Sequence, residues 1–276
     1  MKNIDTLVKD IYSLFDNGKA CDKHTTQALG EAVANVVSER LAAYKEVKEP
    51  YLRLSMIGKP DRQIYYELKG YPKETLPANA KIKFLYGDIL ECLLLFLAKE
   101  AGHKVEGEQD TIEVNGVKGH RDAVIDGVTV DVKSASPFSF KKFEDSSIIF
   151  DDPFGYIAQL SAYDKKGGAF LVIDKQNGNL CLSKVDEDIT IDASKRIDEL
   201  RPMLNKDAPP ERCYEEIPEG KPGNMRLGIG CSYCPFKYEC WKDCNNGQGL
   251  RVFGYSTGVK FMTKIIKEPK VNEYAN

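Results

Sequence analysis

The sequence predicts an α/β protein in which a mixed central sheet is flanked by helices. Two patterns predict this fold class: apolar residues recur at helical spacing in the N-terminal third, and short β-rich runs separated by turn residues follow. The chain has 276 residues and is 42% hydrophobic. It is therefore long and apolar enough to bury a sizeable core without help from disulfides.

Helical and strand periodicity define the expected elements. Helices are expected at 3–16, 27–46, about 81–101, about 155–165 and about 192–204. Strands are expected at 111–117, 119–125, 128–134, 168–174 and 179–184. The chain is accordingly divided into an N-terminal helical cap (1–50), an α/β core (51–206), and a cysteine-rich segment with a basic tail (207–276).

Charge and apolar patterning limit the classes of function. The net charge is −3, which argues against a protein that coats nucleic acid by bulk electrostatics. Basic residues gather in 251–276, which is either a local nucleic-acid patch or a solvated tail. The sequence has no apolar stretch of membrane-spanning length, no signal peptide and no Gly-rich phosphate loop. A cytoplasmic protein that is not a helicase motor and has mostly reduced cysteines is expected.

The most informative segment is a predicted β-hairpin. Asp126-Gly127 lies between two β-branched runs, and Asp-Gly is a strong signal for a two-residue hairpin loop. With that loop, Asp122 lies directly opposite Asp131 on the neighbouring strand. Side chains two apart on a strand share a face, so Lys133 is expected on the same side as both acids.

Two carboxylates aimed at each other on a half-buried face require a compensating cation. Mg²⁺ or Mn²⁺ meets this need, because hard cations take oxygen ligands and keep several waters. Lys133 would then orient or help deprotonate the attacking water, or stabilise charge on a phosphate. The alternative is that Asp131 and Lys133 are solvent-facing residues of an amphipathic strand, because a bare Asp-x-Lys recurs by chance.

The order of these residues resembles the PD-(D/E)XK nuclease superfamily, in which an Asp on one strand precedes (Asp/Glu)-x-Lys on the next. Upstream, Gly87 followed four residues later by Glu91 is similar to the motif of the RecB-like branch. Downstream, Gln159 and Tyr163 are similar to the Gln-x3-Tyr helix motif of that branch. The resemblance implies a restriction-endonuclease-like core, makes Glu91 a third metal ligand, and places the Gln-x3-Tyr pair beside the active site and the nucleic-acid strand.

Five of the eight cysteines crowd into one segment: Cys213, Cys231, Cys234, Cys240 and Cys244. The Cys-x2-Cys-x5-Cys spacing of the middle three resembles the iron–sulfur members of the RecB-like branch, among them CRISPR-associated adaptation nucleases. Those relatives take a fourth, N-terminal cysteine where this chain has Pro60. The resemblance to phage-encoded exonucleases favours Cys213 as the fourth ligand, with Cys244 in reserve. Both [4Fe–4S] and Zn²⁺ accept four thiolates; the resemblance favours the cluster, and either would act structurally.

Four side chains are expected to contact nucleic acid: Lys59, Arg62, Tyr163 and Trp241. For Arg62 the alternative is a surface position, and for Trp241 it is packing against the metal lobe. The expected function is a metal-dependent exonuclease acting on single-stranded DNA or duplex ends, with recombination or replication proteins as possible partners in phage DNA metabolism. Two alternatives remain open: a site-specific endonuclease and a non-catalytic DNA-binding adaptor.

Overall fold

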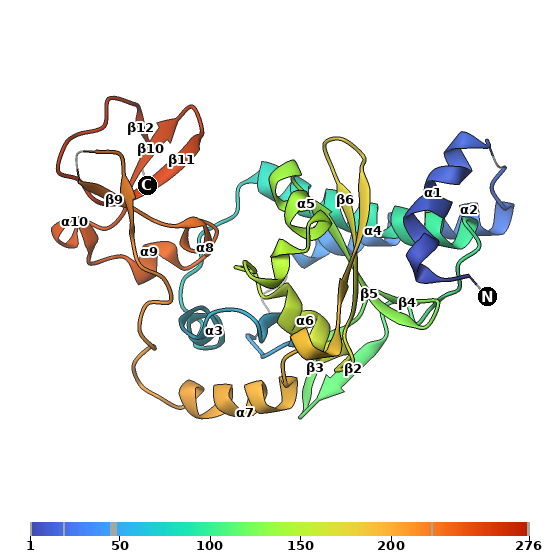
Figure 1. Cartoon of the computed structure of the whole chain (residues 1–276). Coiled ribbons are helices and arrows are strands. Elements are labelled where there is room, and N and C mark those ends of the chain that lie inside the picture. Colours follow the sequence, from blue (N-terminus) through green and yellow to red (C-terminus); the bar gives the residue numbers. More distant parts are fainter. Residues whose placement is uncertain (1, 19, 45–48, 222, 275–276) are drawn as a thin grey trace. The chain divides into compact units, whose positions relative to one another are not determined.

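The computed structural model describes residues 2–18, 20–44, 49–221 and 223–274, and it has the α/β class that the sequence predicts. The chain forms two structural units (Figure 1). Unit 1 comprises Met1–Gly58 and Leu76–Asp198, and unit 2 comprises Lys59–Thr75 and Glu199–Asn276. The N-terminal helices thus belong to the same unit as the central sheet, whereas Lys59–Thr75, which the sequence assigns to the core, joins the C-terminal part.

Unit 1 contains a mixed sheet in the strand order β1-β4-β5-β6-β7 and a separate β2-β3 hairpin. Its strands are β1 (Val105–Glu106), β2 (Thr111–Val114), β3 (Val117–His120), β4 (Ala123–Ile125), β5 (Val128–Ala135), β6 (Gly168–Asp174) and β7 (Leu180–Val185). The β5–β6 pair is parallel and the other pairs are antiparallel. The helices are α1 (Leu7–Asp16), α2 (Lys23–Ala43), α4 (Ala78–Glu100), α5 (Pro137–Glu144) and α6 (Tyr156–Tyr163), and α7 (Ala193–Leu204) extends from unit 1 into unit 2.

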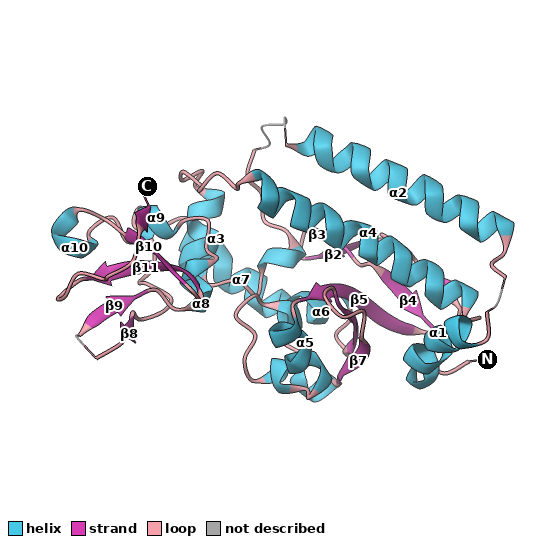
Figure 2. Cartoon of the chain, turned by 90° about the horizontal axis from the view of Figure 1, so that it is seen from above, coloured by secondary structure: helices cyan, strands magenta, loops and turns pink. Residues whose placement is uncertain are grey.

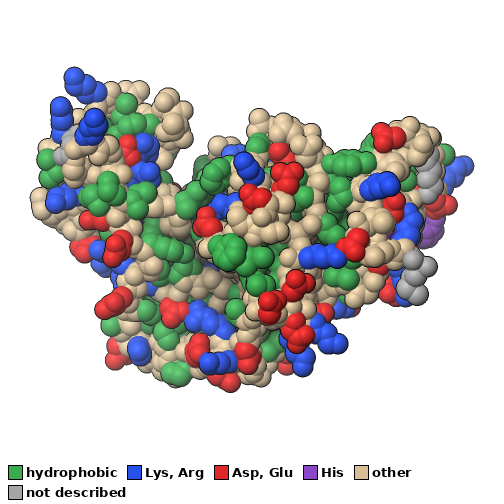
Figure 3. Space-filling view, viewed as in Figure 1, with side chains coloured by type: hydrophobic (Ala, Val, Ile, Leu, Met, Phe, Trp, Pro, Cys, Tyr) green, Lys and Arg blue, Asp and Glu red, His purple; other side chains and the backbone are tan. Residues whose placement is uncertain are grey.

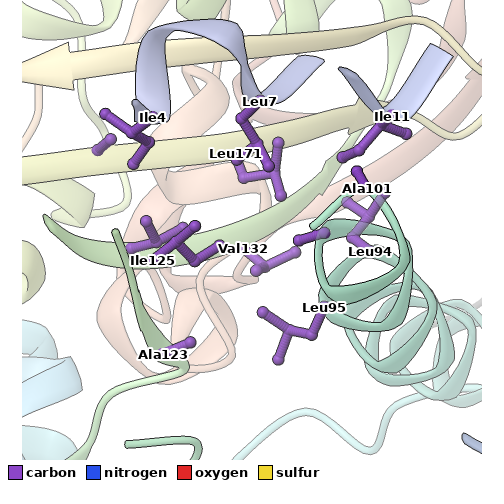
Figure 4. Packing of buried hydrophobic residues seen from close by; sticks show 13 residues of the cluster. Ile4, Leu7, Ile11, Leu94, Leu95, Ala101, Ala123, Ile125, Val132 and Leu171 are labelled. Carbon is purple, nitrogen blue, oxygen red and sulfur yellow. The ribbon is translucent and has the colours of Figure 1, made fainter. Parts of the chain in front are cut away.

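Helices cover both faces of the central sheet. On one face, side chains from α1 and α4 pack with those of β4, β5 and β6 (Figure 4). On the other face, α5 and α6 pack against Phe170 and Val172 of β6. The first face contains the predicted N-terminal helix and the predicted apolar helix, so amphipathic patterning identified the elements that form this core.

The helix α2 runs alongside α4 (Figure 2). Its first turn is capped by the Asp22 carboxylate, which accepts hydrogen bonds from the backbone of His24 and Thr25. Near its end, Arg40 makes a bidentate contact with Asp88 of α4, with N–O distances of 2.6 and 2.7 Å. The predicted end of this helix, from 45 to 46, lies outside the described residues.

The predicted hairpin register is confirmed. Ala123, Val124 and Ile125 pair with Val130, Thr129 and Val128. Asp126 and Gly127 have φ values of 51° and 86°, as a type I′ turn requires. The Asp126 carboxylate accepts a 3.0 Å hydrogen bond from the backbone of Lys104 and lies 2.6 Å from His103, and these contacts help to hold the left-handed conformation.

Two predicted strands are broken in the structure. The run 111–117 bends at Asn115-Gly116, where both φ values are positive, and forms the separate β2–β3 hairpin. The run 119–125 is interrupted at Arg121-Asp122. The helix α5 was not predicted, although Ser136 caps it and Pro137 occupies its first turn.

Unit 2 contains a second sheet that the sequence did not predict. Its antiparallel order is β12-β10-β11-β9-β8. The strands are β8 (Ile217–Glu219), β9 (Asn224–Arg226), β10 (Arg251–Tyr255), β11 (Gly258–Lys264) and β12 (Glu273–Tyr274). The helices are α3 (Asp61–Leu68), α8 (Ile229–Ser232), α9 (Lys237–Cys240) and α10 (Cys244–Gly247).

The expectation of a basic tail over 251–276 is therefore wrong. Much of that segment is strand, and its charges are partly neutralised. Arg251 pairs with Glu268 at 2.5 Å and with Glu273 at 2.6 Å, and Lys260 pairs with Glu219. On the face drawn in Figure 3, basic and acidic side chains are interspersed. Within the described ranges, no helix has both the length and the apolarity needed to cross a bilayer.

Candidate active site and cysteine cluster

Unit 1 brings the predicted catalytic residues together. Asp122 precedes β4, and its Oδ2 accepts a 2.7 Å hydrogen bond from the backbone of Val132. Asp131 on β5 is 1% exposed and forms an ion pair with Lys133, two residues further along the same strand. Glu91 on α4 lies near enough to Asp131 and Lys133 for their charges to shift its pKa.

Burial and the neighbouring acids disfavour ionisation of Glu91 and Asp122. Burial, and then the charge of Asp131, raises the pKa of Glu91 to about 7. The pKa of Asp122 is raised well above its ordinary value by burial and by the other two acids. For Lys133, burial opposes the charged form, but Asp131 and Asp122 outweigh it and raise the pKa of the ammonium. The carboxylates therefore resist joint ionisation in the presence of a single ammonium group.

Helix α6 contributes the predicted Gln-x3-Tyr pair. The Gln159 side-chain amide donates to Oδ1 of Asp131 at 3.1 Å, and it lies 3.2 Å from the Tyr163 hydroxyl. Oδ2 of Asp131 is buried and accepts no hydrogen bond of normal geometry, although it forms the ion pair with Lys133. One oxygen of this acid is thus fixed by an amide while the other faces only the ammonium.

Gly87 allows α4 to approach β5, the strand that carries Asp131. A Cβ atom at this position would lie 3.2 Å from Oγ of Ser134 on β5, which is tighter than most side-chain contacts. The glycine that precedes Glu91 therefore has a steric role in placing it.

Two residues at this site, Gln109 and Tyr156, were not predicted from the sequence. The Gln109 side-chain amide donates to Glu91 at 2.7 Å, and its backbone N–H donates to the carbonyl of Asp122 at 3.2 Å. Gln109 has a φ of 57°, an uncommon conformation for a residue other than glycine. Tyr156 lies with its ring 5.1 Å from Nζ of Lys133. Gln109 lies in a loop outside the predicted motifs, so the local sequence pattern did not indicate that it belongs to the site.

If Glu91 binds a divalent cation, Gln109→Ala should weaken Mn²⁺ binding by about tenfold, because a residue that hydrogen-bonds to a metal-binding side chain typically contributes that much. The measurement is the Mn²⁺ affinity of each protein by isothermal titration calorimetry. Gln27→Ala is the control, since the Gln27 side chain donates a hydrogen bond to Glu31 of its own helix. An unchanged Mn²⁺ affinity would show that Gln109 does not position Glu91.

The raised pKa of Glu91 predicts how stability depends on pH without metal. Between about 4.5 and about 7, the carboxyl is ionised in the unfolded chain but still protonated in the folded one. The unfolded state then binds fewer protons, so the free energy of unfolding falls as pH rises through this window, by on the order of 3 kcal/mol. Denaturant titrations in EDTA should show a smaller fall for Glu91→Gln. Glu31→Gln should retain it, and equal slopes for both variants would contradict the prediction.

Unit 2 brings four of the five clustered cysteines together. Cys213, Cys231, Cys234 and Cys240 line one pocket, and Cys244 does not. Burial raises the pKa of Cys231 and of Cys234 to about 11. Hydrogen bonds to these thiols oppose the shift, and the neighbouring thiols add to it. The pKa of Cys244 is raised by burial and then by Asp243, not by the other thiols. Cys213, and not Cys244, therefore lies at the pocket of the other three cysteines.

Two predicted nucleic-acid contacts are directed inward to this pocket. Arg62 bonds to the carbonyl of Pro210, stacks 5.1 Å from the Tyr66 ring centroid, and interacts with Cys240. Trp241 is 4% exposed and lies under the guanidinium of Arg212. The expectation that Trp241 stacks on a base is therefore wrong. Its burial supports the alternative, that it packs within unit 2. Lys59 is partly buried at the start of unit 2.

Within the described residues, no group of three or more His, Cys, Asp or Glu side chains has an arrangement that could hold a metal ion. Neither a protein-family model nor a curated protein sequence matches the chain. Among solved structures, the chain is similar to "Crystal structure of SSO0001". That match has 18% identity, covers 76% of this chain and 93% of that chain, and has a TM-score of 0.41. Functional inference therefore rests on the side chains themselves.

Proposed function

We propose that the protein is a Mg²⁺- or Mn²⁺-dependent deoxyribonuclease with a PD-(D/E)XK-type core. The observation that carries this proposal is the convergence of Glu91, Asp122 and Asp131 beside Lys133. Three acids beside one ammonium resist joint ionisation in a partly buried setting, and a bound divalent cation would let all three ionise.

These three acids would hold the cation after their side chains reorient, because the described residues contain no preformed ligand group. Oδ2 of Asp131 supports this assignment, because it is buried and its one partner among the described residues is the Lys133 ammonium. When bound, Mg²⁺ or Mn²⁺ supplies a Lewis acid that lowers the pKa of a water molecule and withdraws charge from the scissile phosphate.

The side chains around the acids have separate roles in this proposal. Lys133 keeps its proton, because the adjacent carboxylates raise its pKa. It therefore acts as a hydrogen-bond donor to the attacking water or to a phosphate oxygen rather than as a general base. Gln159 fixes the rotation of the Asp131 carboxylate, and Tyr163 supports that amide. The buried ring of Tyr163 would contact a strand through its hydroxyl edge.

The cysteine cluster is proposed as a structural metal lobe. Cys213, Cys231, Cys234 and Cys240 would hold a [4Fe–4S] cluster, with Zn²⁺ as the alternative. Four sulfur atoms suit either group, and neutral thiols with raised pKa values gain a favourable charged state only when a cation is bound. Four thiolate ligands leave no open position for hydrolysis, so this lobe would stabilise unit 2.

Action on single-stranded DNA or duplex ends as an exonuclease is proposed by analogy with the relatives that carry such a cysteine lobe. The same analogy suggests phage DNA recombination, replication or degradation in the host cytoplasm, with recombination or replication proteins as partners.

The proposal is tested by incubating the purified protein with end-labelled linear DNA and with covalently closed circles. We expect Mn²⁺-dependent cleavage of linear DNA that Asp131→Ala abolishes. Binding without cleavage by the wild type would favour a DNA-binding adaptor, and equal cleavage of circles would favour an endonuclease. Cleavage that survives both EDTA and Asp131→Ala would overturn the site assignment.

A further inference from the structure

Three phenylalanine rings of α5 and of the segment between α5 and α6 are exposed to solvent. Phe138, on α5, and Phe150 and Phe154, between the two helices, are 71%, 91% and 39% exposed. Single exposed rings are ordinary, but several on one short segment indicate an interaction site. We call these three residues and Tyr156 the aromatic surface. Figure 3 shows hydrophobic side chains reaching the surface of this part of unit 1.

Tyr156 connects the aromatic surface to the candidate active site. The Tyr156 ring centroid lies 5.6 Å from that of Phe154. It also lies 5.1 Å from Nζ of Lys133. Tyr156 therefore places the aromatic surface next to the Lys133 ammonium, which would face a scissile phosphate.

The loop that carries Phe150 is held in place by hydrogen bonds. Nζ of Lys142 lies 5.6 Å from the Phe138 ring centroid and contacts both the carbonyl and the carboxylate of Asp151. The carboxylate of Asp152 accepts hydrogen bonds from Gly155 at 2.9 Å and Ile157 at 2.8 Å. These contacts join the start of α5, the loop and the start of α6. The Phe150 ring is thus presented by an ordered backbone.

We propose that the aromatic surface stacks on unpaired bases and that the substrate is single-stranded DNA; this inference rests on the proposed nuclease function. Stacking needs the flat face of a base, which a duplex hides between neighbouring pairs and an unpaired strand exposes. Two lysines lie beside rings of this surface, Lys142 by Phe138 and Lys133 by Tyr156. Neighbouring rings and cations suit a strand in which bases alternate with phosphates.

The test is DNA binding by fluorescence anisotropy in an Asp131→Asn background with Mn²⁺, which keeps the strand intact. The probes are a thymine oligonucleotide, an abasic oligonucleotide of equal length, and a blunt duplex. Phe150→Ala should weaken binding of the thymine strand by roughly tenfold, as removal of one stacking ring does elsewhere. It should leave binding of the abasic strand and the duplex unchanged. Phe15→Ala is the matched control, because Phe15 on α1 is 68% exposed.

The inference is overturned if Phe150→Ala weakens the thymine and abasic strands equally, if it weakens neither, or if neither strand binds. A change only in oligomeric state would instead identify the aromatic surface as a protein contact. Failure of the nuclease proposal looks different: the wild type would distinguish thymine from abasic DNA yet cleave neither in Mn²⁺. Melting curves of Phe150→Ala and of Phe154→Leu, which retains apolar volume, separate loss of stacking from misfolding.

Discussion

Replacing Lys133 with methionine is expected to lower kcat for DNA hydrolysis by about 10²- to 10³-fold, the usual effect of losing one donor that stabilises transition-state charge. Methionine keeps the length of the aliphatic stem but removes the ammonium. Asp131 then retains only the Gln159 amide as a partner for its carboxylate. The kinetic loss should appear in kcat, since the acids that would hold the metal remain.

The same substitution should destabilise the metal-free protein, because a buried carboxylate loses its counter-charge, a change that costs about 3–5 kcal/mol. Mn²⁺ should restore most of this stability. Lys184→Met is a matched control, because Lys184 forms an exposed ion pair with Asp5. A Lys133→Met protein that folds in Mn²⁺ and retains full kcat would exclude a catalytic role for this lysine.

Prediction from sequence succeeded where the determining interactions are local. The turn conformation of Asp126-Gly127 depends on two residues, and it fixes the pairing of the flanking strands. Because that register is fixed, the approach of Asp122 to the backbone of Val132 follows from it. The spacing of Cys231, Cys234 and Cys240 is similarly local, since one short turn and one helical turn separate them.

Prediction failed where distant segments meet. Gln109 reaches Glu91 from a loop whose backbone φ is positive, and no periodic pattern encodes that contact. The sheet of unit 2 includes strands of only two or three residues, too short for alternation to be recognised. For Trp241 the sequence left base stacking and packing as alternatives, because a single aromatic residue carries no information about burial until the fold around it is known.

Replacing Cys234 or Cys213 with serine is expected to release the bound metal and to destabilise unit 2 by several kcal/mol, of the order seen when structural metal sites are lost. Cys244→Ser is the matched control, because this cysteine lies in the same unit but does not line the pocket of the other four. Iron and zinc contents of anaerobically purified protein, together with visible absorption, identify the metal. Equal metal loss from Cys244→Ser would contradict the ligand assignment.

The chain's sole tryptophan provides an independent readout of this lobe. The Trp241 side chain hydrogen-bonds to Cys231 and is buried. Metal release should therefore change the tryptophan fluorescence, whereas oxidation of an unrelated thiol such as Cys181 should not. If the four thiols were only small apolar side chains, serine would leave the emission of Trp241 and the metal content unaltered. The fluorescence of one residue thus distinguishes a metal lobe from four packed thiols without reference to nuclease activity.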